Sequence, residues 1–193
     1  MRVVAGNFKG RRLGGPASPM TRPTSDRVRE ALFSIVGDVT DSRVLDLFAG
    51  TGALGIEALS RGAGHATFVE RDAKALSVLR ANLETVFGGA PPVDRVSVVR
   101  GDVLRRIAAD DGPYDLILLD PPYRDSERLT PPLARDLPPT LTEAGVIVAE
   151  CDRRAPLLLE SAAQDPSQVT LMLTGEYKYG DTLLRVFRRS QAG

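Results

Sequence analysis

Hydrophobic residues between positions 43 and 150 come in short, nearly unbroken runs that alternate with stretches of helical spacing. The runs predict strands over residues 43–48, 66–70, 96–100, 115–120 and 146–150. Between the first three runs, residues 53–61 and 73–87 carry apolar side chains three and four positions apart, which predicts two helices. Apolar strands that alternate with helices are typical of a parallel sheet covered on both faces.

The pattern changes toward the C-terminal end of the chain. Residues 169–174 and 182–187 predict two strands, joined by a connection that holds tyrosines and a glycine and has no room for a helix. We therefore expect these two strands to pair antiparallel, with Tyr177 and Tyr179 in the turn between them. The sequence thus predicts an α/β fold whose parallel sheet carries an antiparallel hairpin at its C-terminal edge.

A further helix is predicted near the N-terminal end. Thr24 is a good N-cap, and an apolar stripe from Val28 to Val36 follows it at helical spacing. The stripe is expected to pack on the body of the protein. The charged face, with Arg27, Arg29 and Glu30, is then expected to face solvent or a ligand.

The first strand leads directly into a glycine loop, Gly50-Thr51-Gly52-Ala53-Leu54-Gly55, and then into a helix. Glu70 ends the next strand, 20 residues after Gly50. Glycines at such a turn let the backbone approach a ligand, and the acid can accept hydrogen bonds from ribose hydroxyls. Dinucleotides and S-adenosylmethionine both carry such a ribose. The loop by itself leaves a nicotinamide dehydrogenase and a methyltransferase open.

Two acids near the glycine loop favour a methyltransferase. Asp46 lies inside the apolar strand, where a carboxylate is costly unless it is paired. It can face the cationic methionine end of S-adenosylmethionine, or accept from the loop's own amides. Asp102 follows Gly101 after the third strand, where it can accept from the adenine amino group or form a simple turn.

The fourth strand ends in Asp120-Pro121-Pro122-Tyr123, and ligands of open α/β sheets bind at the carboxyl ends of strands. Two prolines remove two N–H donors, which leaves the Asp120 carboxylate and a proline carbonyl as acceptors for an amino group. Asp120 can also take up the proton lost on methylation, and Tyr123 can stack on a flat base. The motif predicts methylation of an exocyclic amino group on a flipped or single-stranded nucleobase.

Composition and charge agree with such a partner. Of the 193 residues 42% are apolar and 26% charged, an ordinary globular balance with zero net charge. Residues 1–30 nevertheless hold seven basic side chains against two acids. This local positive charge is typical of a surface that binds nucleic acid, but a solvated tail would have it too. The absence of a long apolar run argues against a membrane span, and the polar start argues against a signal peptide.

The remaining reactive side chains are few. His65, the single histidine, is placed in a loop, and with no second histidine or cysteine cluster no metal site is expected. Cys151, the single cysteine, is expected to be a packed thiol and fits a reducing compartment, so we expect a cytoplasmic protein. The sequence shows no additional apolar helical face that a second subunit would have to cover, so a monomer is expected.

The motifs together resemble a known family. Residues 44–59, 68–72, 101–102 and 118–123 are similar to class I Rossmann-like methyltransferases that act on amino groups. The segments 2–13, 22–33 and 176–187 resemble more narrowly the RsmD family of bacterial 16S rRNA guanine-N2 methyltransferases. The resemblance implies a mostly parallel seven-stranded sheet with helices on both faces. It also implies S-adenosylmethionine as cofactor and a flipped guanine of 16S rRNA as substrate, in assembled or partly assembled 30S subunits.

The resemblance assigns roles by position. Asp46, Gly50, Gly52, Glu70 and Asp102 match the family's cofactor motif, and Asp120 to Tyr123 match its catalytic motif. The candidate cofactor-binding set also includes Phe48, Ala49, Gly55, Arg71 and Val103. Residues 1–23 are expected to form a basic RNA-contacting extension of a methyltransferase domain over residues 24–193. The candidate RNA-binding residues are Arg2, Lys9, Arg11, Arg12, Arg22, Thr24 and Arg27.

Three alternatives stay open at this point. An adenine-N6 methyltransferase acting on DNA or RNA uses the same type of acid-Pro-Pro-aromatic corner. A dehydrogenase would bind NAD through the glycine loop. A ribosome-assembly factor would bind RNA and keep a cofactor site without catalysis.

Overall fold

The computed structural model describes residues 1–15, 25–109, 112–160 and 169–190. The chain forms two compact units, Met1–Val103 and Leu104–Gly193. In the part of the chain that is described, no helix is long and apolar enough to cross a membrane.

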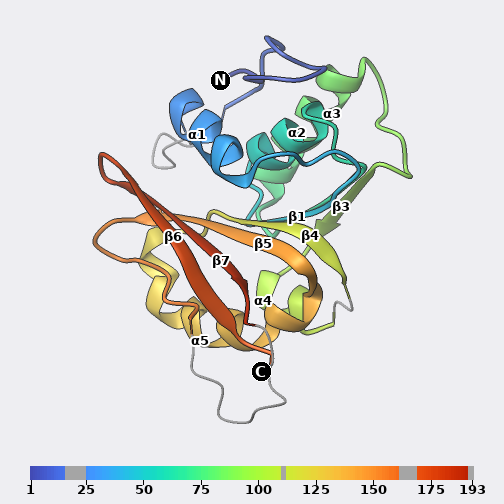
Figure 1. The fold of residues 1–193 in the computed structure, drawn as a ribbon. Coiled ribbons are helices and arrows are strands. Elements are labelled where there is room, and N and C mark those ends of the chain that lie inside the picture. The colour runs from blue at the N-terminus through green and yellow to red at the C-terminus, as the bar shows by residue number, and fades with distance from the viewer. Residues whose placement is uncertain (16–24, 110–111, 161–168, 191–193) are drawn as a thin grey trace. The chain divides into compact units, whose positions relative to one another are not determined.

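The first unit is built on parallel strands with helices between them (Figure 1). Strands β1 (Arg43–Leu47), β2 (His65–Glu70) and β3 (Val96–Arg100) lie in the order β3-β2-β1, and α2 (Ala53–Ser60) and α3 (Ala73–Phe87) connect them. Residues 44–47 and 66–69 are buried, as expected for parallel strands covered on both faces. The strands and helices predicted over this region are therefore confirmed.

Helix α3, which follows Glu70 and packs behind the glycine loop, begins, ends and packs as its sequence predicts. The side chain of Asp72 caps it by accepting from the Ala75 N–H at 2.8 Å, and Gly88 ends it in the left-handed conformation. One face is buried, as the predicted stripe requires; its members are Leu76, Leu79, Asn82, Leu83 and Val86. A polar residue, Asn82, thus lies in an otherwise apolar face.

Helix α1 (Asp26–Val36) differs from the prediction in two ways. Its N-cap is Ser25, whose hydroxyl accepts from the Val28 N–H at 3.2 Å, so the prediction of Thr24 as the cap was wrong. Thr24 itself lies outside the described residues. Arg29 does not belong to an open charged face but is fully buried. Its guanidinium donates to the Arg2 carbonyl at 2.6 Å and to Asp26 at 2.7 Å, partners that the helical pattern alone does not reveal.

The N-terminal segment, residues 1–15, is packed on α2. The N–H groups of Val4 and Ala5 donate to the two carboxylate oxygens of buried Glu57, at 2.8 and 2.9 Å. The Phe8 N–H donates to the Ser60 hydroxyl at 2.9 Å, and the Ser60 hydroxyl donates to the Ala5 carbonyl. Figure 1 shows this segment in dark blue beside α2 and α3. Although basic, the segment is held by buried polar contacts along much of its length.

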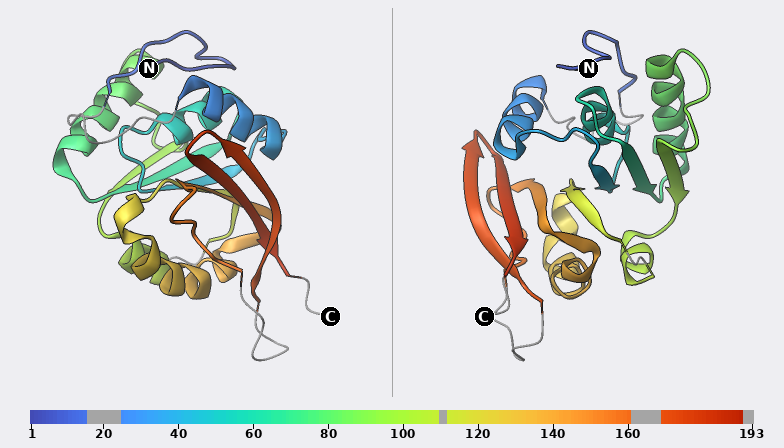
Figure 2. Two further views of the ribbon diagram at one scale, coloured as in Figure 1. Left: turned by 90° about the vertical axis from the view of Figure 1, so that its left-hand side faces the viewer. Right: turned by 45° about the vertical axis from the view of Figure 1, so that its right-hand side comes forward.

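The second unit also contains parallel strands, followed by a hairpin. Strands β4 (Tyr114–Leu119) and β5 (Leu141–Asp152) are parallel, and β7 (Thr182–Arg189) pairs antiparallel with both β5 and β6 (Leu171–Tyr179). The order within this unit is β4-β5-β7-β6, and Figure 2 shows β6 and β7 as long red arrows. The expected α/β class, mostly parallel with an antiparallel C-terminal hairpin, is confirmed.

Several elements depart from the predicted boundaries. Tyr177 and Tyr179 lie in β6 rather than in the turn, which is formed by Gly180-Asp181, because alternating side chains extend the strand up to the glycine with positive φ. His65 begins β2 instead of lying in a loop. Helices α4 (Val103–Ala108) and α5 (Ser126–Asp136), with 3-10 turns at 123–125 and 138–140, were not predicted. In α5, Pro131 and Pro132 obscure the helical pattern.

Gly6 packs closely against the Ser60 backbone of α2, and it provides a first test. It has φ +79°, and a Cβ there would overlap the Ser60 carbonyl. Gly6→Ala should therefore lower the free energy of unfolding by about 1–3 kcal/mol, measured by chemical denaturation. The control is Gly10→Ala, since Gly10 has a similar φ of +82° but no neighbour around its Cβ position. Equal losses in the two variants would show that the contact with α2 is not what matters.

Candidate active site

The glycine loop between β1 and α2 has the backbone that its sequence requires. Gly50 and Gly52 have φ of +55° and +79°, and Phe48 before them has φ +61°, a rare conformation for a residue with a side chain. A Cβ at Gly52 would overlap Leu79, and a Cβ at Gly55 would overlap the Phe68 ring. The loop is thus tightly turned, and the side chains of Leu79 and Phe68 pack closely against its glycines. Gly52 is the N-cap of α2 and, as a glycine, supplies no side chain to bond the first turn.

Asp46 is buried in β1 and bonded to the helix that follows the loop. Its Oδ2 accepts from the Gly55 N–H at 2.9 Å. Burial raises the pKa of the Asp46 carboxyl to about 7; the Gly55 hydrogen bond opposes this rise, and the negative charge of Glu70 adds to it. The carboxyl therefore has the capping role that was one of its two interpretations, and it stays close to its titration point at neutral pH.

Glu70 holds the loop from the neighbouring strand. Its Oε2 accepts from the Gly50 N–H at 2.9 Å, and its Oε1 accepts from the N–H groups of Arg71 and Asp72, each at 2.8 Å. One carboxylate thereby ties the glycine loop to the start of α3. Oε1 already accepts two N–H groups, so the remaining acceptor capacity lies on Oε2, because a carboxylate offers about four lone-pair sites, two on each oxygen.

The other predicted cofactor residues lie at the same edge of the first unit. Ala49 is buried and donates its N–H to the Val69 carbonyl at 3.1 Å, whereas Arg71 is exposed. Asp102 is half-buried just after β3, and Val103 is buried at the start of α4. The register of the parallel strands pairs Leu47 with Val69 and Glu70 with Arg100, so the carboxyl ends of all these strands meet here. The structure thus brings the predicted cofactor residues together.

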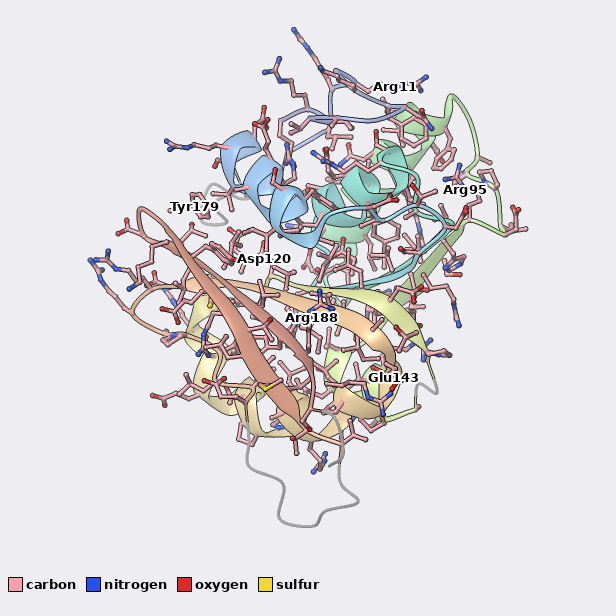
Figure 3. All side chains as sticks on the ribbon, in the orientation of Figure 1. Arg11, Arg95, Asp120, Glu143, Tyr179 and Arg188 are labelled. Carbon is pink, nitrogen blue, oxygen red and sulfur yellow. The ribbon has the colours of Figure 1, made fainter. Side chains whose placement is uncertain are left out.

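The predicted catalytic corner follows β4 in the second unit. Asp120 is half-buried, Pro121 is buried and Pro122 is exposed (Asp120 is labelled in Figure 3). The Pro122 carbonyl accepts from the Asp125 N–H at 2.9 Å, which closes the 3-10 turn that Tyr123 begins. Of the two proline carbonyls, that of Pro122 is therefore engaged in the turn. The predicted pair of acceptors, the Asp120 carboxylate and one proline carbonyl, would therefore use the Pro121 carbonyl.

The predicted RNA-binding residues fall into two groups. Lys9, Arg12 and Arg27 are exposed. Arg2 is 68% exposed and ion-paired with Asp26, while Arg11 donates to the Thr85 and Val86 carbonyls at the end of α3. Figure 3 labels Arg11 on the N-terminal segment. Arg22 and Thr24 lie outside the described residues.

Sequence reasoning missed three polar residues beside this region: Glu57, Ser60 and Asn82. All are buried in helices, where they bond to backbone groups of the N-terminal segment. Their one signal was a polar residue within an apolar helical face, which does not say what it bonds to. Among the described residues, no group of three or more histidine, cysteine or acidic side chains is arranged to hold a metal. Cys151 is buried, which raises the pKa of its thiol.

Comparison with known proteins places this geometry in a class. The "Putative rRNA methyltransferase YlbH" of Bacillus subtilis is 39% identical over 194 residues, covering 98% of this chain and 99% of that protein. The "Ribosomal RNA small subunit methyltransferase D" of Escherichia coli K12 is 42% identical over 125 residues, which is 64% of this chain and 61% of that protein. The solved structure "Putative methyltransferase yhhF from Escherichia coli" superposes with a TM-score of 0.74 at 31% identity, with 98% of each chain covered.

Fold, site and relatives define the class as a Rossmann-like methyltransferase. The chain belongs to the family described as conserved hypothetical protein 95, whose model matches residues 1–188. The resemblance to the RsmD family found in the sequence is thereby confirmed.

Asp46 gives a pH-dependent prediction. Its pKa is about 7 in the folded protein and near 3.9 in an unfolded chain, so folding favours the protonated form. The difference in free energy of unfolding between the wild type and Asp46→Asn measures what Asp46 contributes, and this contribution should be largest below pH 4. It should then fall, by an amount on the order of a few kcal/mol, as the pH rises to 7 and beyond. Urea denaturation at pH 4.5 and pH 8 measures the difference, and a pH-independent difference would contradict the raised pKa.

Proposed function

We propose that this protein transfers a methyl group from S-adenosylmethionine to the exocyclic N2 amino group of a flipped guanine in 16S rRNA. The observation that carries the proposal is the Asp-Pro-Pro-Tyr corner directly after β4, in a chain with relatives that are named as rRNA methyltransferases. We infer that the substrate is presented in an assembled or partly assembled 30S subunit. We also infer that the protein acts as a monomer in the cytoplasm.

The first unit would bind the cofactor. Its glycine loop would let the backbone approach the ligand closely, and Glu70 Oε2 keeps a lone pair for a ribose hydroxyl. Asp102 would accept from the adenine amino group. An ionised Asp46 would favour the cationic methionine end, and that charge in turn would favour ionisation of Asp46. Phe48, Ala49, Gly55, Arg71 and Val103 complete the proposed set.

The second unit would hold the base. S-adenosylmethionine would supply an electrophilic methyl group for the amino nitrogen, with S-adenosylhomocysteine as the by-product. Asp120 and the Pro121 carbonyl would accept the two amino hydrogens and so direct the nitrogen lone pair at the methyl group. Asp120 would then take up the proton, directly or through solvent. Tyr123 would stack on the base, and the remaining rate enhancement would come from alignment of the reactants.

The basic N-terminal residues would bind RNA backbone. Lys9, Arg12 and Arg27 are exposed, and Arg2 is largely so, which suits contacts with phosphates that carry little sequence information. Arg11 would act in part by holding the segment on α3, since its guanidinium already bonds two carbonyls there. Arg22 and Thr24 remain proposed members of this surface, and the extension 1–23 remains its proposed extent.

The chemistry is tested by incubating the protein with methyl-labelled S-adenosylmethionine and undermethylated 30S subunits, then digesting the RNA to nucleosides for mass spectrometry. Label is expected in N2-methylguanosine. Asp120→Asn should lower the rate by about 100-fold or more, because the amide cannot take up a proton and is a weaker acceptor for an amino hydrogen than a carboxylate. Asp94→Asn, an exposed acid before β3, is the matched control and should leave the rate unchanged.

Each other outcome of this assay selects an alternative. Label in N6-methyladenosine would keep the mechanism and replace guanine by adenine. No label on particles, naked RNA or DNA would favour a binding factor without catalysis. A separate calorimetric titration tests the remaining alternative: binding of NAD, without binding of S-adenosylmethionine, would identify a dehydrogenase.

The RNA-binding role of the N-terminal segment is tested through salt dependence. Replacing Lys9 and Arg12 by alanine should weaken RNA binding and reduce the slope of log K against log salt by about 1 to 2. The double variant Arg153→Ala/Arg154→Ala removes the same charge from an exposed turn after β5 and should leave the slope unchanged. Fluorescence anisotropy with a 16S rRNA fragment measures both slopes, and equal slopes would remove the N-terminal segment from the binding surface.

A further inference from the structure

Asn82 is a buried polar side chain on the apolar face of α3, where its relative exposure is 3%. Its side-chain amide bonds to backbone groups from two distant parts of the chain. Nδ2 donates to the Thr51 carbonyl at 2.9 Å and to the Gly14 carbonyl at 3.2 Å, and Oδ1 accepts from the Gly14 N–H at 2.6 Å. Buried amides of this kind are retained when their donors and acceptors are needed, because an apolar residue would pack there at no polar cost.

One of these partners is the centre of the glycine loop. Thr51 lies between Gly50 and Gly52, and its carbonyl is turned back toward α3 to receive the Asn82 amide. Gly52 rests on Leu79, one turn before Asn82 on the same helix. The loop is therefore seated on α3 by an apolar contact and a hydrogen bond side by side, and its position depends on both.

The other partner is the end of the N-terminal segment. The Asn82 amide bonds both polar groups of Gly14, and a Cβ at this glycine would lie 3.3 Å from both Asn82 Oδ1 and Val78 Cγ1. The rest of the segment is held on α2 by Glu57 and Ser60 and on the end of α3 by Arg11. Asn82 thus connects a basic segment directly to the loop that would receive the cofactor.

We propose that Asn82 is a positioning residue that couples cofactor binding at the glycine loop to the order of the N-terminal RNA-contacting segment. The inference rests on the proposed function, since it takes the loop as the cofactor site and the segment as an RNA surface. A ligand that fixes the Thr51 carbonyl fixes the Asn82 amide, and with it both polar groups of Gly14. By linkage, RNA that orders the segment tightens cofactor binding by the same factor by which the cofactor tightens RNA binding.

The test uses S-adenosylhomocysteine as probe and hydrogen exchange of the full chain as readout. In the wild type, saturating S-adenosylhomocysteine should slow amide exchange in residues 11–15 several-fold, in addition to residues 48–56. In Asn82→Ala the probe should bind about tenfold more weakly, the loss expected for one hydrogen bond. At saturation it should still protect residues 48–56 but no longer residues 11–15.

Ser60→Ala is the matched control. It removes a side-chain anchor of the same segment, at Phe8 and Ala5, without touching the glycine loop. The segment should exchange faster throughout, but S-adenosylhomocysteine should still slow residues 11–15. Asn82→Asp is the second variant if Asn82→Ala does not fold: it keeps an acceptor for the Gly14 N–H and loses the donor to Thr51, and should lose the same probe-dependent protection.

The outcomes separate this inference from the proposed function. Binding of S-adenosylhomocysteine with unchanged exchange in residues 11–15 would overturn the coupling and leave the methyltransferase proposal intact. Retained protection of residues 11–15 in the Asn82 variants would show that the coupling does not pass through this residue. No binding of S-adenosylhomocysteine at all would overturn both.

Discussion

The backbone of the glycine loop is held by two carboxylates that reach it from neighbouring strands. Asp46 binds the helix that leaves the loop, and Glu70 binds the N–H of the first glycine as well as the start of α3. Because these bonds are made to backbone groups, the loop keeps its shape without a bulky side chain in the space that a ligand would need. The same two carboxylates tie the starts of α2 and α3 to this edge of the first unit.

Burial makes ionisation of Asp46 unfavourable, and this has a consequence for binding a cation. A carboxylate without solvent is protonated readily, and the Asp46 pKa of about 7 shows this. A positively charged ligand nearby would restore the ionised form, so the same burial that weakens the empty protein at neutral pH would strengthen the attraction for a sulfonium cation. Perturbed carboxyl groups of this kind are concentrated at functional sites.

The N-terminal segment is better understood as part of the first unit than as a loose tail. Glu57, Ser60 and Asn82 bond its backbone, while the side chains of Lys9 and Arg12 are exposed. Holding a basic surface by backbone contacts leaves its side chains available for phosphates and reduces the entropy that binding would cost. The segment would thus present its charges from a rigid base.

The sequence alone determined most of the regular structure and the class of protein, because both depend on local patterns of residues. Apolar runs and helical spacing predicted the strands of the parallel sheet and helix α3 to its last residue, and the two motifs that indicated a methyltransferase each consist of consecutive residues. Local patterns failed where a distant partner decides. Arg29 is buried because the Arg2 carbonyl and Asp26 satisfy its guanidinium, Pro122 is partly engaged because the chain turns back at Asp125, and Asn82 faces inward because Gly14 and Thr51 meet there. A polar residue in an apolar stripe is visible in the sequence, but its partners are brought to it only when the chain has folded.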